Sequence, residues 1–227
     1  MIGGADGRKM SKRWGNVINP DDVVQTYGAD TLRVFEMFLG PFEAHLPWNE
    51  EGIIGSRRFI DSVFRMYNTV EIKNSVESID KVYHQTVQKV TSDYEKLSFN
   101  TAISQMMILV NAINKEKAMS FEHAKGLLTM LNPIIPHVTN ELNEIIFKDN
   151  SDLAYQSWPT FDESKLVEDT VEIVVQVNGK IKLKKSIPLN MDKDVLLNNV
   201  KEELDLLDAT IIKEIVVPNK LVNLVVK

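Results

Sequence analysis

The chain has 227 residues, of which 44% are hydrophobic, and it carries a formal net charge of -6 without any cysteine. This apolar content can supply a hydrophobic core, so a disordered chain is not expected. No apolar run approaches the roughly 20 residues of a membrane span, and no signal peptide is recognisable. We therefore expect a cytoplasmic protein with no membrane partner, no disulfide and no thiolate zinc site. The negative charge excludes a generally basic nucleic-acid coat, so any RNA contact needs a local basic patch.

Two short helices are predicted near the N-terminus. Residues 1–18 are rich in glycine and lysine and predict a loop. Asn19 is a helix cap, Pro20 is tolerated at the first helical position, and the two aspartates that follow suit the positive end of the helix dipole. This helix is expected to end at Gly28. Asp30 is predicted to cap a second helix over TLRVFEMFL, which a Gly-Pro pair closes.

Longer amphipathic segments follow, with apolar side chains repeated at helical spacing. One stripe contains Phe59, Ile60, Val63, Phe64 and Tyr67, and the next contains Val82, Tyr83, Val87, Val90, Tyr94 and Leu97. A further helix is expected over residues 101–114, with Met106 and Met107 filling the interior. Two shorter helices are expected around FEHAKGLLTML and HVTNELNEIIF, the latter introduced by Pro136. Together these segments predict a helix bundle with short connections.

The apolar period changes to two beyond YQSWPTFDESKL, which indicates strands. Two strands are predicted around Asn178-Gly179, an amphipathic helix over DKDVLLNNVKEELDLL, and two more strands around Pro218-Asn219. Trp158 is expected to pack at the crossing between the bundle and these strands. The predicted fold is therefore mainly α, with a small α+β module of β-β-α-β-β order after the bundle.

The first turn of this module can have two lengths. A two-residue loop at Asn178-Gly179 would pair Val175 with Lys182 and mix lysines into the apolar face. A three-residue loop with a left-handed Gly179 pairs Val175 with Ile181 instead. We predict this second register. It also pairs Ile173 with Leu183, lays Glu172 across from Lys184, and gathers Lys180, Lys182 and Lys184 on the opposite, exposed face.

Several motifs carry a family resemblance. KMSK at residues 9–12, followed by GNV and INPDDVVQTYGADTLR, resembles the signature loop of class I aminoacyl-tRNA synthetases and the helices after it. WNEEGIIGSRRF, NPIIPH, SWP and VEIVVQVNGKIK are similar to the C-terminal part of bacterial leucyl-tRNA synthetase. The resemblance covers essentially the whole chain. The cysteine zinc sites common in isoleucyl and methionyl relatives, and the terminal coiled coil of valyl ones, are not found in this sequence.

The resemblance implies that the loop handles ATP phosphates. Lysine ammonium groups in such a loop stabilise charge on the triphosphate, and a mobile loop closes only when ATP is present. Lys12 is the predicted phosphate contact, supported by Lys9, and Met10 and Ser11 shape the loop, so these four are the candidate catalytic residues. Arg13 stands where the family usually has a second serine, which puts the closing hydrogen bonds in doubt. A solvated basic loop is the alternative.

The nucleotide-binding sheet and the His-x-Gly-His motif of the family are missing from this sequence. The four histidines, which occur in no such arrangement, are His45, His84, His123 and His137. We therefore expect a fragment of leucine-tRNA ligase that is inactive alone, with leucine, ATP and Mg²⁺ bound only by the full enzyme. His137, at a helix start, is interpreted as structural. The alternative is a free-standing tRNA-binding or interaction protein without catalysis.

Four segments with different roles are expected, and the whole is expected to be a monomer that binds tRNA(Leu). They are residues 1–19, a remnant of the catalytic domain; 20–48, stem-contact helices; 49–166, an anticodon-binding-type bundle; and 167–227, a tRNA-contacting module. The candidate RNA contacts are Lys180, Lys182, Lys184, Lys185, Arg57 and Arg58. Lysines at alternate strand positions are about 7 Å apart and can follow a phosphate backbone. A solvated helix face, and lysines that protect a strand from aggregation, are the alternatives.

Overall fold

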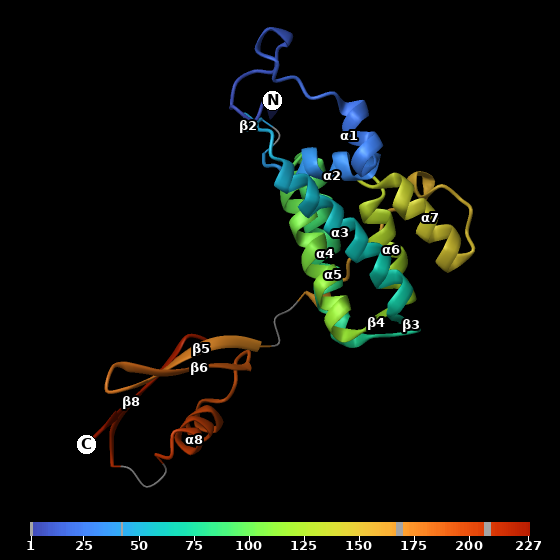
Figure 1. Ribbon diagram of the computed structural model, residues 1–227. Coiled ribbons are helices and arrows are strands. Elements are labelled where there is room, and N and C mark those ends of the chain that lie inside the picture. The colour runs from blue at the N-terminus through green and yellow to red at the C-terminus, as the bar shows by residue number, and fades with distance from the viewer. Residues whose placement is uncertain (1, 42, 167–169, 207–209) are drawn as a thin grey trace. The chain divides into compact units, whose positions relative to one another are not determined.

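The computed structural model describes residues 2–41, 43–166, 170–206 and 210–227. The chain divides into two compact units, Met1–Leu166 and Val167–Lys227. The first unit is mainly helical, and the second is built on a four-stranded sheet (Figure 1). The expected boundary at residue 167 lies outside the described residues. The last helix, expected to reach residue 207, ends at Glu203, and Asp205 is left-handed with φ of 53°. Within the described ranges, no helix combines the length and apolar character needed to cross a lipid bilayer.

The first unit is a bundle of helices with short connections, as the apolar periodicity predicts. The helices are α1 (Pro20–Tyr27), α2 (Ala29–Phe38), α3 (Glu50–Thr69), α4 (Glu77–Glu95), α5 (Phe99–Glu116), α6 (Phe121–Leu131) and α7 (Pro136–Phe147). Helices α3, α4 and α5 lie alongside one another, and α6 and α7 pack against this group (Figure 1). Met106 is fully buried in the main core, and Met107 packs against the same cluster, which confirms their predicted role.

The start of the bundle follows the predicted capping in one helix and departs from it in the next. Asn19 Oδ1 accepts a hydrogen bond from the Asp21 N–H at 3.2 Å, and α1 ends at Gly28, both as predicted. The prediction that Asp30 caps α2 is wrong. Gly28 occupies the N-cap position of α2 and makes no side-chain cap, while the Asp30 carboxylate bonds to α7 instead.

Two residues of the predicted apolar stripes are exposed. Phe64 on α3 has a relative exposure of 41%, although its neighbour Val63 is fully buried. Phe64 follows Val63 in the sequence and therefore lies at the edge of the apolar stripe and not at its centre. Leu97 is also exposed, because it follows the end of α4 in a left-handed conformation with φ of 57°. The stripe assignment was therefore wrong for these two residues.

The first unit also contains short elements that have no apolar periodicity and were not predicted from the sequence. Strand β1 (Ile2–Gly3) pairs in parallel with β2 (Leu46–Pro47), and β3 (Glu71–Lys73) pairs in parallel with β4 (Ala118–Ser120). A single 3-10 turn, η1 (Lys12–Trp14), lies within the N-terminal loop. The strands bring segments far apart in the sequence together, and β1 ties the N-terminal loop to the segment before α3.

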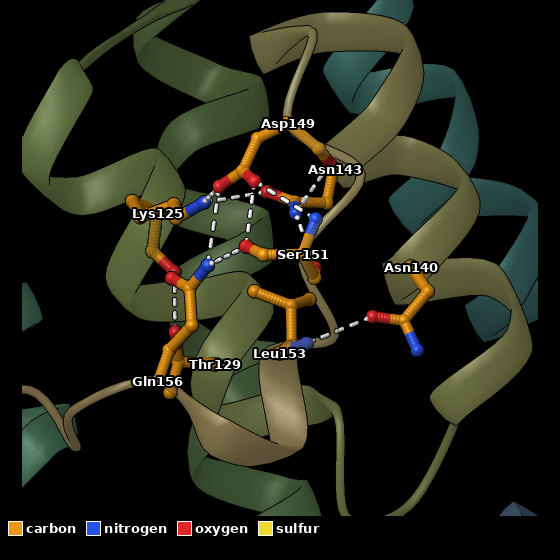
Figure 2. Close-up of polar contacts among 8 residues, drawn as sticks. All are labelled: Lys125, Thr129, Asn140, Asn143, Asp149, Ser151, Leu153 and Gln156. Atoms are coloured by element: carbon orange, nitrogen blue, oxygen red, sulfur yellow. Dashed lines mark hydrogen bonds and ion pairs between the residues drawn. The ribbon is translucent and has the colours of Figure 1, made fainter.

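A polar network fixes the connection after α7 to α6 (Figure 2). Lys125 Nζ donates to Asn143 Oδ1 at 2.6 Å and to Asp149 Oδ2 at 2.7 Å. The buried Asn143 donates to the carbonyl oxygens of Asp149 and Ser151 at 2.8 and 3.2 Å. Gln156 Nε2 donates to Asp149 Oδ2 at 3.1 Å. The hydrogen bonds from Lys125 and Ser151 hold the pKa of the Asp149 carboxyl well below its usual range.

The segment that follows this connection is also fixed to the bundle. Trp158 Nε1 donates to Thr91 Oγ1 at 2.8 Å, and the indole ring packs against Tyr94 with centroids 5.6 Å apart. Further along, the Asp162 N–H donates to His84 Nδ1 at 3.2 Å. Trp158 and His84 therefore have packing and hydrogen-bonding roles within the first unit.

The second unit is a four-stranded mixed sheet with one helix. Its elements are β5 (Thr170–Val177), β6 (Lys180–Pro188), α8 (Lys193–Glu203), β7 (Ile211–Val217) and β8 (Leu221–Val226). The spatial order is β6-β5-β8-β7, with β5 and β8 parallel and both hairpins antiparallel. Side chains of α8 and of one sheet face form a common apolar core. The predicted β-β-α-β-β order is confirmed.

The first hairpin turns through two residues rather than the predicted three. Asn178 and Gly179 are both left-handed, with φ of 51° and 76°, and Val177 pairs with Lys180. Two consecutive positive φ values are what a two-residue hairpin turn of this kind requires, and Asn-Gly is the sequence best suited to it. The left-handed Gly179 is confirmed, and the three-residue loop is wrong.

The hairpin contains a β-bulge at Lys182 in β6. This bulge, and not a third loop residue, is the extra unpaired residue of the hairpin. The pairing passes from Gln176 with Ile181 to Val175 with Leu183, so Lys182 has no partner across the hairpin. The predicted pairs were therefore wrong. The observed partners are Leu183 for Val175, Lys185 for Ile173, and Ser186 for Glu172. Both registers weighed from the sequence assumed uninterrupted strands, whereas a bulge shifts the register inside a strand.

Candidate nucleotide and RNA contact sites

The loop that carries the KMSK sequence is organised around the side chain of Asn16. Its Oδ1 accepts from the Ser11 N–H at 2.8 Å, and its Nδ2 donates to Asp6 Oδ1 at 3.2 Å and to the Lys9 carbonyl at 3.4 Å. Asp6 Oδ1 also accepts from the Arg8 N–H at 3.0 Å. The hydrogen bonds from Arg8 and Asn16 lower the pKa of Asp6. One carboxamide thus links both ends of the loop.

The four predicted catalytic residues divide into two exposed lysines and two supporting residues. Lys9 and Lys12 are exposed, and their ammonium groups form no hydrogen bond or ion pair within the described part of the chain. Ser11 Oγ accepts from the Arg13 N–H at 3.2 Å and so caps η1. Met10 packs against a small apolar cluster under the loop. This arrangement leaves both ammonium groups free to meet an anionic ligand.

Trp14 provides a common surface for two arginines. The guanidinium carbons of Arg8 and Arg13 lie 5.1 and 5.4 Å from its ring centroid. Such cation-π contacts are worth about 0.5–1 kcal/mol at exposed sites. The Arg13 side chain therefore packs on Trp14, and the Ser11 hydroxyl supplies the capping hydrogen bond. Arg13 could be singled out from the sequence, but the roles of Trp14 and Asn16, which follow within four residues of Lys12, were not predicted.

The Asp30 carboxylate connects α2 to the start of α7. Its Oδ1 lies 2.7 Å from His137 Nδ1, and its Oδ2 accepts from the Val138 N–H at 2.8 Å. An ionised carboxylate can only accept hydrogen bonds, so Nδ1 of His137 carries the proton. The His137 side chain is 73% exposed, and its Nε2 atom is left for other contacts. His137 therefore has a structural partner at Nδ1, whereas Nε2 forms no hydrogen bond with any described residue.

The two arginines predicted to contact RNA lie in different surroundings on α3. Arg57 Nε donates to Asp61 Oδ1 at 2.8 Å, and Arg57 Nη1 donates to the Tyr27 carbonyl at 3.4 Å. Arg58 is exposed, and among the described residues its guanidinium has no hydrogen-bond or ion-pair partner. Arg58 is therefore the freer of the two cations.

The three lysines predicted to share an exposed face, Lys180, Lys182 and Lys184, are exposed, but they do not share one face. Lys184 pairs with Val174, on the face opposite to the buried Val175. Lys180 pairs with Val177, on the same face as Val175, and the bulged lysine between them has no cross-strand partner. The predicted common face is wrong because the bulge interrupts the alternation of side chains along β6.

Two of the four hairpin lysines already have acidic partners. Lys184 Nζ lies 3.2 Å from Glu172 Oε1, and both side chains are largely exposed, so this pair contributes little to stability. Lys185 is half-buried and forms an ion pair with Glu203 of α8. Lys185 therefore ties the helix to the sheet. Across the described ranges, no cluster of three or more histidine, aspartate or glutamate side chains could hold a metal ion.

Two family models match parts of this chain. Residues 1–46 match the family model for tRNA synthetases class I (I, L, M and V), and residues 77–197 match the model for the anticodon-binding domain of tRNA ligase. The second match alone covers more than half of the chain. The chain therefore belongs to the family of anticodon-binding domains of tRNA ligases, here joined to a class I synthetase segment.

Among solved structures, the chain is similar to the leucyl-tRNA synthetase in the crystal structure of the ternary complex of Agrobacterium radiobacter K84 agnB2 LeuRS-tRNA-LeuAMS. The sequence identity is 28% and the TM-score is 0.71. The match covers 100% of this chain and 33% of that chain, so this chain spans about a third of the length of its structural relative.

Proposed function

We propose that this chain is part of a leucine-tRNA ligase, which activates leucine with ATP and esterifies it to tRNA(Leu). The observation that carries the proposal is that one chain combines the lysine loop of a class I synthetase with an anticodon-binding bundle. The choice of leucine is supported by the likeness of this chain to one third of a leucyl-tRNA synthetase and by the VEIVVQVNGKIK segment. We infer a cytoplasmic monomer, with ATP used together with Mg²⁺.

The proposed chemistry of the loop follows from its charges. When the leucine carboxylate attacks the α-phosphorus of ATP, pyrophosphate leaves and negative charge grows on the β and γ phosphates. The ammonium group of Lys12, supported by Lys9, stabilises that charge. Met10, Ser11 and Asn16 keep the backbone between the lysines in shape.

The proposed division of labour follows the chain. Residues 1–19 belong to the catalytic domain, 20–48 contact the tRNA stem, 49–166 form the anticodon-binding-type bundle, and 167–227 contact tRNA through exposed hairpin lysines. Lys180 and Lys182 are the freest of these lysines, because Lys184 and Lys185 have acidic partners. Of the two arginines of α3 proposed to contact RNA, Arg57 forms an ion pair with Asp61, so Arg58 is the more available for a phosphate.

Two experiments test the two halves of this function. In a synthetase that contains this chain, Lys12→Ala should slow leucine-dependent ATP-pyrophosphate exchange by about a hundredfold, as expected for loss of one preorganised charge donor. Leucine binding should change much less. A rise in the Michaelis constants with unchanged turnover would mean that Lys12 only binds ground-state ATP.

The second experiment measures tRNA binding by the chain itself. A leucine tRNA transcript should bind with an affinity that falls as salt rises, because the lysines displace counterions from phosphates. Changing Lys180 and Lys182 to Glu together should weaken binding and make the salt dependence shallower. Lys96→Glu and Lys115→Glu, on the bundle surface, serve as a control with the same charge change. Equal effects of both pairs would contradict a special role for the hairpin lysines.

A further inference from the structure

A groove of about 540 Å³ lies in the first unit, where the α1-α2 junction, α3 and the start of α7 meet. Its volume falls within the range of about 300–1,000 Å³ that is usual for ligand pockets. The side chains that define its character are Ile60, Phe64, Val138, Arg57, Arg65 and His137. The α3 wall comes from residues 47–76, which neither family match includes. Residues of the α1-α2 junction and Arg57, already proposed to contact tRNA, line this groove, but no ligand has been assigned to the groove itself.

The lining of the groove includes the partly exposed aromatic ring of Phe64. Phe64 is 41% exposed, while Ile60, one helical turn earlier on α3, also lines the groove but is buried. The ring has no aromatic partner among the described residues, in contrast to Phe121, which packs against Phe147 with centroids 4.9 Å apart. The exposed part of the Phe64 side chain is therefore available for contact with a planar group.

The polar rim of the groove contains one unmatched cation and one oriented imidazole. The charge of Arg57 is matched by Asp61, 2.8 Å away. Arg65 also lines the groove, and its guanidinium has no hydrogen bond or ion pair with any described residue. His137 is held through Nδ1 by Asp30, which leaves Nε2 as a fixed hydrogen-bonding atom at the rim.

We propose that this groove binds an unpaired nucleotide of an RNA, with the base stacked on Phe64. Unpaired bases are commonly recognised by stacking on an aromatic side chain together with hydrogen bonds to a base edge or ribose. His137 Nε2 supplies such a hydrogen bond, and Arg65 pairs with the adjoining phosphate. The unmatched charge of Arg65 favours a polyanion over an apolar protein segment. The proposal rests on the tRNA binding proposed above and names one nucleotide site within it.

The test compares two RNA probes, a leucine tRNA transcript and a fully paired RNA duplex, with variants of Phe64 and Arg65. Phe64→Ala and Phe64→Leu should weaken tRNA binding by about tenfold, because stacking on one aromatic ring is lost. Phe64→Trp should retain binding, since it keeps the stacking surface. Arg65→Ala should weaken binding and lower the salt slope by about one. Phe121→Ala removes an exposed aromatic outside the groove and should leave binding unchanged.

The duplex should bind equally well to the wild-type chain and to the Phe64 variants, because it has no unpaired base to stack. Circular dichroism and thermal unfolding will confirm that each variant is folded. Unchanged tRNA affinity in Phe64→Ala, or a wild-type affinity in Phe64→Leu, would overturn the nucleotide site. In either case, weakening by Lys180→Glu with Lys182→Glu would leave the proposed tRNA-binding function intact. A wild-type chain that binds no tRNA would overturn both proposals.

Discussion

Asp30 Oδ2 accepts a hydrogen bond from the Val138 N–H at 2.8 Å, so a carboxylate of α2 satisfies the start of α7 more than a hundred residues away. The N-cap residue of α7, Ile135, makes no side-chain cap. The first N–H groups of a helix lack partners inside it, and a negative charge is favourable there. The Asp30 side chain is only 6% exposed. Because it accepts from the Val138 N–H, it takes the place of the side-chain cap that Ile135 cannot provide.

We predict that Asp30→Ala lowers the free energy of unfolding by about 1–3 kcal/mol, because it leaves a buried donor unsatisfied. Asp30→Asn keeps an acceptor oxygen and should cost less. Urea denaturation of the chain measures both. Asp22→Ala, which removes an exposed carboxylate without a hydrogen bond among the described residues, is the matched control. An Asp30→Ala variant as stable as Asp22→Ala would contradict the capping role.

The same contact shows how far sequence reasoning reached in the bundle. The helices could be predicted because their apolar residues repeat at a local spacing, and Asn19 caps a helix only two residues away. The partner of Asp30 could not be predicted, because nothing local in the sequence marks a residue that distant. Phe64 was misplaced for a related reason. Periodicity identifies the centre of an apolar stripe, but the neighbouring elements decide which flanking residues are covered.

A second prediction concerns the scaffold of the lysine loop. Asn16→Ala removes hydrogen bonds to Ser11, Asp6 and Lys9 together, so the loop backbone should open more readily. Amide hydrogen exchange of Ser11 should become about five- to tenfold faster, as expected for loss of a hydrogen bond worth about 1 kcal/mol. Lys12→Ala, which leaves these bonds in place, should exchange like the wild type. Unchanged exchange in Asn16→Ala would show that the turn itself holds the loop.

A third prediction tests the packing of Arg13 on Trp14. Arg13→Ser introduces the serine that is usual at this position in class I aminoacyl-tRNA synthetases. It also removes the Arg13 guanidinium, whose carbon lies 5.4 Å from the centroid of the Trp14 ring. The fluorescence emission of Trp14 should shift to longer wavelength and become easier to quench with iodide. Trp48 is buried in the apolar cluster under the loop, and Trp158 donates to Thr91, so both should report no change. Arg13→Lys should preserve most of the wild-type signal.

The hairpin illustrates a second limit of sequence reasoning. The turn residues Asn178 and Gly179 were recognised, and the two-residue loop they form was one of the two alternatives weighed. It was rejected because an uninterrupted strand would have placed Lys182 in the apolar face. The structure keeps the favoured turn and places Lys182 in a bulge. A bulge has no residue signature of its own here, so only the tertiary packing of Val175 and Leu183 reveals it.

The last prediction concerns the pH dependence of stability through Asp149. Lys125 and Ser151 hold the pKa of Asp149 below its usual range, so the unfolded chain binds a proton at this carboxyl more readily than the folded chain does. The stability that Asp149 contributes is therefore fully present above its unfolded pKa of about 3.9 and is lost as the pH falls through the folded value. Wild type should exceed Asp149→Asn in free energy of unfolding at pH 7.

That difference should shrink progressively below about pH 4, where the carboxyl protonates in the unfolded chain. Urea denaturation at several pH values measures it. Lys125→Met removes the main cause of the shift, so combining it with Asp149→Asn should add less than the sum of the single changes, because the two side chains share one ion pair. Asp21→Asn, whose carboxylate has no hydrogen bond within the described part, is the control. A pH-independent difference between wild type and Asp149→Asn would show that the network stabilises the connection by geometry and not by charge.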